Sequence, residues 1–513
     1  MGVADPIRGE PRLAAVKEPG AETAGAGPGL NAWNARAVRG MSFLAGRQVI
    51  CQAVAVTSSI TLARLLEPYH FGIFGVAAAL AAAFSLFSEF GLAPSLVQRK
   101  AEPDERELQV AFTLQLLLVA VAVLVGLVAS PFVVEALYPG RHDVVWLARI
   151  LLASLFLTSA RAISIIRLER QLRHDRLALI ETVETLAYYG LVVCLAWFKW
   201  GVWSLVWATA LRTLLGAILT FRTAPWSVRL AWDRKVALEL LRYGIPFQVG
   251  VLANSVSGWI APLLVGTLVG PAGVGYLTWA TSNGKKPLML VESVMRVAFP
   301  HFSRLQEHPE ELARTAARYL CYLGLGAGLW GVLIHTAGAR MVALLYTAKW
   351  LPAVPALSLA ATVLMLDLLH WVLGISLAST GRVSVTSRLV LARTAITLAL
   401  LWPMVHCMGF SGVIAAHLAG SALVTPSALA ALGPGPRRIL IRGAAWLLAP
   451  VLLTTGCGWI LARFFSTELL GTIALCGSTA ALYSLSALAA APPWLRESLL
   501  TRLHSARLLT ASR

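Results

Sequence analysis

The sequence predicts an all-α polytopic membrane protein with about 14 transmembrane helices. Of its 513 residues, 58% are hydrophobic and only 13% are charged, and the mean hydropathy is +0.72. These values lie outside the range of ordinary soluble domains. The apolar residues also form long continuous runs without the period-two alternation of a membrane β-barrel strand. We therefore expect membrane-spanning helices along most of the chain.

Each predicted span is an apolar run close to the length that a helix needs to cross a bilayer. That length is about 20 residues, because the hydrocarbon core is about 30 Å thick and a helix rises about 1.5 Å per residue. In chain order, the runs cover residues 43–63, 71–92, 110–130, 144–160, 178–197, 201–220, 243–267, 275–299, 319–337, 353–378, 389–405, 411–432, 443–462 and 468–490.

The distribution of basic residues predicts the orientation of these spans, because lysine and arginine accumulate in cytoplasmic connections. If the N-terminus is cytoplasmic, most of the 43 lysines and arginines fall on that side. The connections on the opposite side hold only Arg64, Arg141, Lys199, Arg340, Lys349 and Arg463. The bias persists to the last connection, so we expect an even number of spans and both termini in the cytoplasm. Topology and attraction to anionic lipid also explain the net charge of +18 without nucleic-acid binding.

A short turn sequence occurs twice, at equivalent positions of the predicted topology. Residues 65–74 read LLEPYHFGIF and residues 268–277 read LVGPAGVGYL, which aligns Pro68 with Pro271 and Gly72 with Gly275. We expect proline to end the first helix of each series and glycine to permit a tight reversal into the next. The repetition predicts two six-helix halves in parallel orientation. This arrangement is typical of transporters that rock two bundles about a central site.

The repeat divides the chain into two lobes with additional segments. Residues 1–40 lack the apolar core and cleavage site of a signal peptide, and we expect a disordered cytoplasmic tail there. The divisions that follow are an N-lobe of six spans at 41–222, a cytoplasmic inter-lobe linker at 223–242, a C-lobe of six spans at 243–432, two C-terminal spans at 433–490 and a cytoplasmic tail at 491–513.

Six short segments between about residue 40 and residue 430 carry a family resemblance. They are ARLLEP at 63–68 with Phe71-Gly72, FSEFGL at 87–92, LVQRK at 96–100, GVWSLV at 201–206, GVGY at 273–276 and FPHFSRL at 299–305. Together they resemble the Wzx-type lipopolysaccharide and exopolysaccharide flippases of the multidrug/oligosaccharidyl-lipid/polysaccharide superfamily, which also contains the MATE transporters.

This resemblance implies a function and a location. It implies a flippase that moves undecaprenyl-diphosphate-linked oligosaccharide repeat units across the bacterial cytoplasmic (inner) membrane by alternating access, for lipopolysaccharide or exopolysaccharide biosynthesis. The implied partners are this lipid-linked oligosaccharide and the membrane lipids. The sequence leaves open which polysaccharide polymerase or glycosyltransferases act with the protein.

Basic residues inside the predicted spans are the candidates for binding this substrate. A charge in the middle of a span costs about 2.5–3.5 kcal/mol on the insertion scale, so it usually faces a cavity or a partner. Lys285 and Lys286 lie mid-span between Asn283-Gly284 and Pro287, a pattern that predicts a helix break. Such cations fit a lipid diphosphate, whose negative charges cannot cross an apolar medium unpaired. The further candidates are Arg47, Arg212 and Arg296.

Each cation also has a structural alternative. The two lysines could extend to a membrane interface if the span is misplaced, and the same applies to Arg47 and Arg296. Arg212 could instead form a structural salt bridge.

Acidic residues inside the spans are candidates for ion coupling. They are Asp367, Glu89 and Glu292. We favour Asp367 because it lies in the middle of a span, with His370 one helical turn away. The alternative for each acid is a structural ion pair.

The sequence does not indicate an enzyme, a cofactor or a metal site. The six cysteines are isolated, without CxxC spacing, and the phosphate-binding loop GxxxxGK[ST] is absent. Two alternative functions stay open. A multidrug or cation antiporter of the same superfamily would need an acid-lined cavity. A membrane polysaccharide polymerase or glycosyltransferase would need a sizeable outer loop or a sugar-nucleotide site, and neither is visible.

Overall fold

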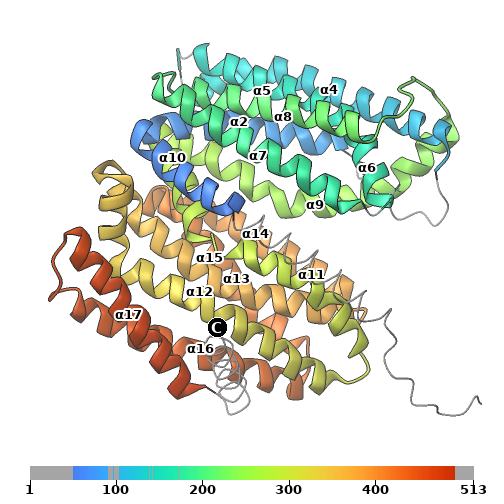
Figure 1. Cartoon of the computed structure of the whole chain (residues 1–513). Helices are drawn as coiled ribbons and strands as arrows, with labels where there is room; N and C mark the ends of the chain where they lie inside the picture. The colour runs from blue at the N-terminus through green and yellow to red at the C-terminus, as the bar shows by residue number, and fades with distance from the viewer. Residues whose placement is uncertain are drawn as a thin grey trace, which may run out of the picture. The chain divides into compact units, whose positions relative to one another are not determined.

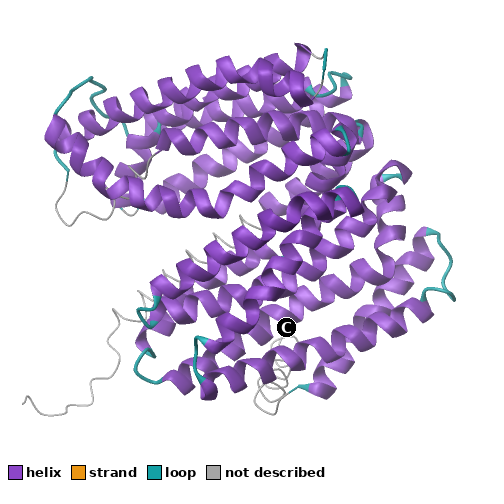
Figure 2. Ribbon diagram, turned by 180° about the vertical axis from the view of Figure 1, so that it is seen from behind, coloured by secondary structure: helices purple, strands orange, loops and turns teal. Residues whose placement is uncertain are grey.

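The computed structural model describes residues 50–89, 96, 103–137, 139–140, 142–171 and 173–491. Within these residues the regular secondary structure is helical, and no strand occurs (Figure 2). Eleven of the described helices are long and apolar enough to cross a membrane. The predicted all-α membrane class is therefore confirmed.

The helices of the first half form one packed group (Figure 1). After a short apolar helix at Ile50–Leu65, α2 and α4 pack on each other and on α5, and α8 packs on α5 and α7. The helix bounds are α2 (Pro68–Glu89), α4 (Glu105–Leu137), α5 (His142–Ala160), the short α6 (Ala162–Arg170), α7 (His174–Trp197) and α8 (Trp203–Thr223).

In the second half, α13 is the central helix and packs against α10, α11, α12 and α15. α9 contacts helices of both halves, namely α2 and α4 of the first and α10 and α14 of the second. The bounds are α9 (Arg234–Leu268), α10 (Pro271–Gly284), α11 (Leu288–Arg304), α12 (Pro309–Tyr346), the 3₁₀ helix η1 (Ala348–Ala353), α13 (Val354–Ser379), α14 (Val383–Met408) and α15 (Ser411–Ala430).

Two further helices, α16 (Pro434–Leu461) and α17 (Leu469–Ala490), pack on each other and on α12 (Figure 1). They therefore extend the second half.

One of the predicted spans differs from a single long helix. The seventh span, 243–267, lies entirely within α9, and the described part of the first span lies in the helix Ile50–Leu65. The eighth is divided into α10 and α11. The total of 14 spans accordingly stays a prediction.

The repeated turn sequence brings the two halves into direct contact. Pro68 and Pro271 are the first residues of α2 and α10, and these two helices pack against each other. A Cβ atom on Gly72 would overlap the carbonyl oxygen of Pro271, and a Cβ atom on Gly275 would overlap the carbonyl oxygen of Pro68. The contact is thus reciprocal. Only glycine permits the two backbones to approach so closely.

The expected role of these two glycines in the chain reversal is therefore wrong. Gly72 and Gly275 lie within α2 and α10, each four residues after the first residue of its helix. In the second copy the reversal instead uses Gly270, whose φ of 91° favours glycine. The turn sequence recurs because each copy supplies half of a helix contact.

Hydrogen bonds join the two halves beside this contact. Arg64 donates from Nε to the carbonyl oxygen of Leu345 at 2.8 Å. In the opposite direction, Trp350 donates from Nε1 to the carbonyl oxygen of Ala63 at 2.8 Å, and Lys349 donates from Nζ to that of Arg64 at 3.0 Å. The halves are consequently held together at the end of the bundle where α2 and α10 begin, which we call the α2/α10 end.

Candidate functional site

The predicted helix break is present between α10 and α11. α10 ends at Gly284, residues 285–287 form a turn, and α11 begins at Leu288. Pro287 explains the break, because proline has no N–H to donate and its ring clashes with the carbonyl group four residues earlier. The break leaves backbone carbonyl groups of α10 without helical partners.

Side chains of α12 satisfy polar groups near this break. Trp330 donates from Nε1 to the carbonyl oxygen of Gly284 at 3.1 Å. Tyr346 donates from its hydroxyl group to Oδ1 of the buried Asn283 at 3.1 Å. A Cβ atom on Gly284 would meet the Ala360 side chain, so glycine also lets the end of α10 pack closely on α13. Contacts with α12 and α13 therefore stabilise the break.

Lys285, the first residue of the break, pairs with a buried acid. Its Nζ lies 2.7 Å from Oδ2 of Asp367, which is on α13. The other carboxylate oxygen, Oδ1, lies 3.0 Å from Nε2 of His417 on α15. The Asp367 side chain is only 9% exposed, whereas those of Lys285 and His417 are 27% and 28% exposed. The three residues form one cluster, which we call the Lys–Asp–His cluster.

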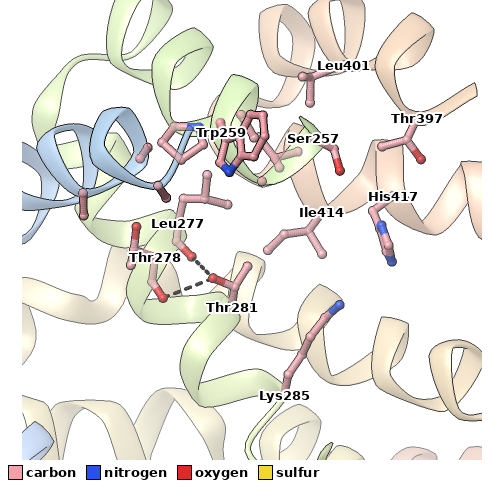
Figure 3. A pocket seen from close by; sticks show the side chains of 18 of the residues that line it. Ser257, Trp259, Leu277, Thr278, Thr281, Lys285, Thr397, Leu401, Ile414 and His417 are labelled. Carbon is pink, nitrogen blue, oxygen red and sulfur yellow. Dashed lines mark hydrogen bonds between the residues drawn. The ribbon is translucent and has the colours of Figure 1, made fainter. Parts of the chain in front are cut away.

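A cavity of about 490 Å³ lies next to this cluster. Lys285 and His417 line it, and the view in Figure 3 shows both side chains at its edge together with Thr281 and Ile414. Helices of both halves contribute, because α2 supplies Phe74 and neighbouring small residues. The turn after α10 supplies Lys285, and α9, α10, α13, α14 and α15 supply the rest. Asp367 is not part of the lining, and its carboxylate contacts the Lys285 ammonium group.

The lining is mostly apolar, with a few polar groups. Trp259 of α9 and the hydroxyl groups of Ser257, Thr278 and Thr397 belong to it (Figure 3). Thr281 already donates to the carbonyl oxygens of Leu277 and Thr278 within α10. Among the described lining residues no carboxylate occurs, so the ionisable side chains facing this space are a lysine and a histidine.

Lys286 and Arg212 lie apart from this cavity. Lys286 is partly buried and does not line it. Arg212 is on α8 of the first half, where its Nε lies 3.7 Å from Oε2 of the buried Glu184. Arg161 pairs with the other carboxylate oxygen of Glu184, and the Arg212 guanidinium also lies over the ring of Tyr188. Arg212 thus belongs to a separate group, which we call the Arg–Glu–Arg cluster.

The other candidates cannot be placed in the cavity. Arg47 lies outside the described residues. Glu89 is the last residue of α2, and Glu292 and Arg296 are on α11, but the side chains of all three lie outside what the structure describes.

Asp367 contacts His417, whereas His370, one helical turn away on α13, contacts Thr425. The Asp367 oxygens contact Lys285 and His417, whereas His370 Nε2 lies 3.3 Å from the Thr425 hydroxyl group. Sequence reasoning missed His417, although an ionisable residue inside an apolar span was an available signal. Its 50-residue distance from Asp367 gave no hint of the pairing.

Among the residues that the structure describes, no group of histidine, cysteine, aspartate or glutamate side chains is arranged to hold a metal ion. The groups present at the site are a lysine, a carboxylate and an imidazole beside a cavity. Such groups can bind an anion through the lysine, and they can exchange ion-pair partners.

Comparison with known proteins gives a family match. A family model described as "Polysaccharide biosynthesis protein" matches residues 61–355. The lipopolysaccharide biosynthesis protein WzxC of Escherichia coli (strain K12) is 22% identical over 373 residues, covering 70% of this chain and 73% of WzxC. The succinoglycan biosynthesis transport protein ExoT of Rhizobium meliloti (strain 1021) is 24% identical over 309 residues, covering 58% of this chain and 60% of ExoT.

Solved structures share the fold. The lipid II flippase MurJ in an inward closed conformation superposes with a TM-score of 0.72 at 13% identity, covering 86% of this chain and 98% of the MurJ chain. An inward-facing multidrug resistance MATE family transporter of the MOP superfamily superposes with a TM-score of 0.56 at 17% identity, covering 78% and 95%. At these identities the likeness shows the fold, which is that of the MATE-like transporters.

Proposed function

The chain belongs to the polysaccharide biosynthesis protein family, whose model matches residues 61–355, and from this premise we propose that it is a flippase for a lipid-linked oligosaccharide. The substrate is an oligosaccharide repeat unit on undecaprenyl diphosphate, and the protein moves it across the bacterial cytoplasmic membrane by alternating access. The names of WzxC and ExoT and the fold of MurJ support this proposal.

One observation of the structure carries the proposal. Lys285 places an ammonium group at a helix break, beside a cavity that helices of both halves line. A cation in the middle of a membrane span is expensive unless it has a partner or faces a cavity. A diphosphate headgroup is a suitable ligand, since its charges need a cation to leave water. The polyprenyl tail can stay in the bilayer while the headgroup passes.

The contacts at the α2/α10 end support a closed state on one side. We propose that this end is the outer one, as the distribution of basic residues predicts. The structure then corresponds to a state that receives its substrate from the cytoplasmic side. Opening to the outside would separate α2 from α10 and break the hydrogen bonds of Arg64, Lys349 and Trp350.

The test is the movement of a fluorescent lipid-diphosphate oligosaccharide between the leaflets of proteoliposomes. We expect wild-type protein to move it and Lys285→Ala to slow the movement at least about tenfold, because the phosphate loses its cation. Lys235→Ala is the matched control, since Lys235 is an exposed lysine near the start of α9. Lys286→Ala tells whether the neighbouring lysine contributes.

The variant must be shown to be folded, because removing Lys285 leaves Asp367 without one of its two partners. Membrane abundance and unfolding temperature provide this check. Wild-type protein that moves no lipid-linked oligosaccharide would contradict the proposed function. Normal movement by folded Lys285→Ala would keep the function and remove Lys285 from the site.

The charge of the cavity argues against the cation antiporter as an alternative. Such a transporter needs acids facing its substrate, and the described lining residues include none. Efflux of organic cations from vesicles that depends on Asp367 would contradict this argument. Of the acids proposed for ion coupling, Asp367 is the one whose side chain is described, and its coupling role stays a proposal.

A further inference from the structure

We propose that Asp367 competes with the anionic headgroup for Lys285 and thereby sets how tightly the cavity holds a lipid diphosphate. The protein would thus carry its own anion, which occupies the phosphate-binding cation between transport cycles. The identity of the lipid rests on the proposed function, but the competition concerns phosphate groups in general.

The position of Lys285 is the first support. Its ammonium group touches a buried carboxylate at 2.7 Å, yet its side chain is 27% exposed and lines the cavity. Asp367 is 9% exposed and is not part of the lining. A ligand in the cavity therefore meets the lysine directly, whereas the carboxylate is almost completely covered. Any phosphate that pairs with Lys285 must draw it away from Asp367 or share it.

The local backbone allows Lys285 to change partners. Lys285 lies in the turn between α10 and α11, where the helix is interrupted. Lysine is a compact charge on a flexible stem with four carbons, so it can pair with different anions by rotation of its side chain. The carboxylate on the continuous helix α13 stays in place. The mobile member of the pair is thus the one that faces the cavity.

His417 provides a partner for Asp367 when Lys285 leaves. An unpaired carboxylate in a buried position is strongly unfavourable. Because the imidazole Nε2 lies 3.0 Å from Oδ1, a protonated nitrogen at that position keeps the carboxylate hydrogen-bonded throughout. The same contact shares the negative charge of Asp367 and weakens its hold on Lys285. His417 is therefore a positioning residue for the exchange.

The competition between Asp367 and the phosphate would speed the release of the substrate. A transporter that bound a diphosphate with a free lysine would release it slowly, because affinity differences appear mainly in the dissociation rate. A carboxylate that reclaims the lysine promotes release. Removing the carboxylate should therefore tighten binding and slow turnover together.

The direct experiment replaces Asp367 with its neutral isostere. Binding of undecaprenyl diphosphate in nanodiscs, and of inorganic pyrophosphate, is measured by tryptophan fluorescence for wild type, Asp367→Asn, Lys285→Ala and the double variant. We expect Asp367→Asn to bind both probes about tenfold more tightly and Lys285→Ala to bind them more weakly. The double variant should behave like Lys285→Ala, since the competitor acts only through the lysine. Undecaprenol, which has no charge, should show no change.

Transport kinetics distinguish the proposed competition from a purely structural role of Asp367. Asp367→Asn should lower the lipid concentration at half-maximal rate and lower the maximal rate of translocation. A variant that is only destabilised would lose activity and binding together. If Asp367→Asn reaches the membrane at a normal unfolding temperature and binds both probes equally or less tightly than wild type, the proposal is overturned.

A further variant, His417→Ala, tests the proposal if Asp367→Asn does not fold. It removes the group that shares the carboxylate charge, so Asp367 should hold Lys285 more strongly. Both probes should then bind a few-fold more weakly. In the Asp367→Asn background, when it folds, the same change should have no effect on binding. Tighter binding by His417→Ala, or an equal loss in both backgrounds, would overturn the proposal.

The two proposals can fail separately. Wild type that moves no lipid-linked oligosaccharide contradicts the flippase function, yet tighter pyrophosphate binding by Asp367→Asn would still establish the competition. Conversely, a working flippase whose affinity does not respond to Asp367→Asn overturns the competition alone.

Discussion

Each half of the molecule contains a buried carboxylate between two basic side chains, but only one of these clusters lies beside the cavity. In the first half, Glu184 on α7 pairs with Arg161 and Arg212. In the second half, Asp367 pairs with Lys285 and His417. A carboxylate with two bases is therefore not by itself evidence of a transport site.

The space beside each cluster distinguishes the two. Both clusters contain a base at a helix interruption, because Arg161 lies between α5 and α6 and Lys285 lies between α10 and α11. A Cβ atom on Gly216 of α8 would overlap the side chains of Glu184 and Arg161, so the helix surface is shaped around the ion pair. In the Lys–Asp–His cluster, by contrast, the lysine lines a cavity that helices of both halves form. The second cluster thus has a base that a ligand in this cavity can meet.

The largest effect on stability is expected from Glu184→Gln. Removing one partner of a buried ion pair costs about 3–5 kcal/mol, because the remaining charges lose their compensation. We expect a lower unfolding temperature and less protein in the membrane, with normal transport per folded molecule. Glu181→Gln, at an exposed position of the same helix, is the control. Full stability of Glu184→Gln with lost transport would instead give the Arg–Glu–Arg cluster a direct function.

A smaller effect on stability is expected at the reciprocal contact between α2 and α10. Gly72→Ala and Gly275→Ala each place a methyl group against a backbone carbonyl of the opposite copy. Overpacking of this kind typically costs about 1–3 kcal/mol. We expect thermal unfolding to show similar losses for both, since the contact is reciprocal. Gly190→Ala is the control because a Cβ atom there meets nothing within 4 Å. A loss in only one of the two variants would show that the halves use the contact differently.

The smallest effect is expected from Arg212→Gln. The Arg212 side chain is 48% exposed and Arg161 still pairs with Glu184 after the change. Partly exposed ion pairs contribute about 0–1 kcal/mol. Unfolding temperature and transport rate should both stay close to wild type. A transport loss as large as that of Lys285→Ala would show that Arg212 also takes part in substrate binding. The distinction between the two clusters would then no longer hold.

The sequence predicts those features that depend on local properties. Hydropathy and helix length predict the membrane spans, and most correspond to long helices. Asn283-Gly284 and Pro287 predict the break between α10 and α11, because the missing N–H of proline interrupts a helix whatever surrounds it. Lys285 and Asp367 stand out as charges inside apolar spans, although the sequence does not show that they pair.

Other features could not be derived from the linear amino-acid sequence. His370 is close to Asp367 along α13, but the histidine that contacts the carboxylate is His417 on α15. Which side chain meets the carboxylate depends on the faces that α10, α13 and α15 turn toward one another. No local periodicity contains that information.

The sequence by itself determined the class of this protein, its duplicated turn and the position of its broken helix, because composition, repetition and proline act locally. The tertiary structure alone decided that the duplicated glycines form one reciprocal contact and that Lys285 shares Asp367 with His417 beside a cavity. These outcomes depend on how helices far apart in the chain pack, because backbones approach only where no Cβ intervenes and buried charges settle where partners meet.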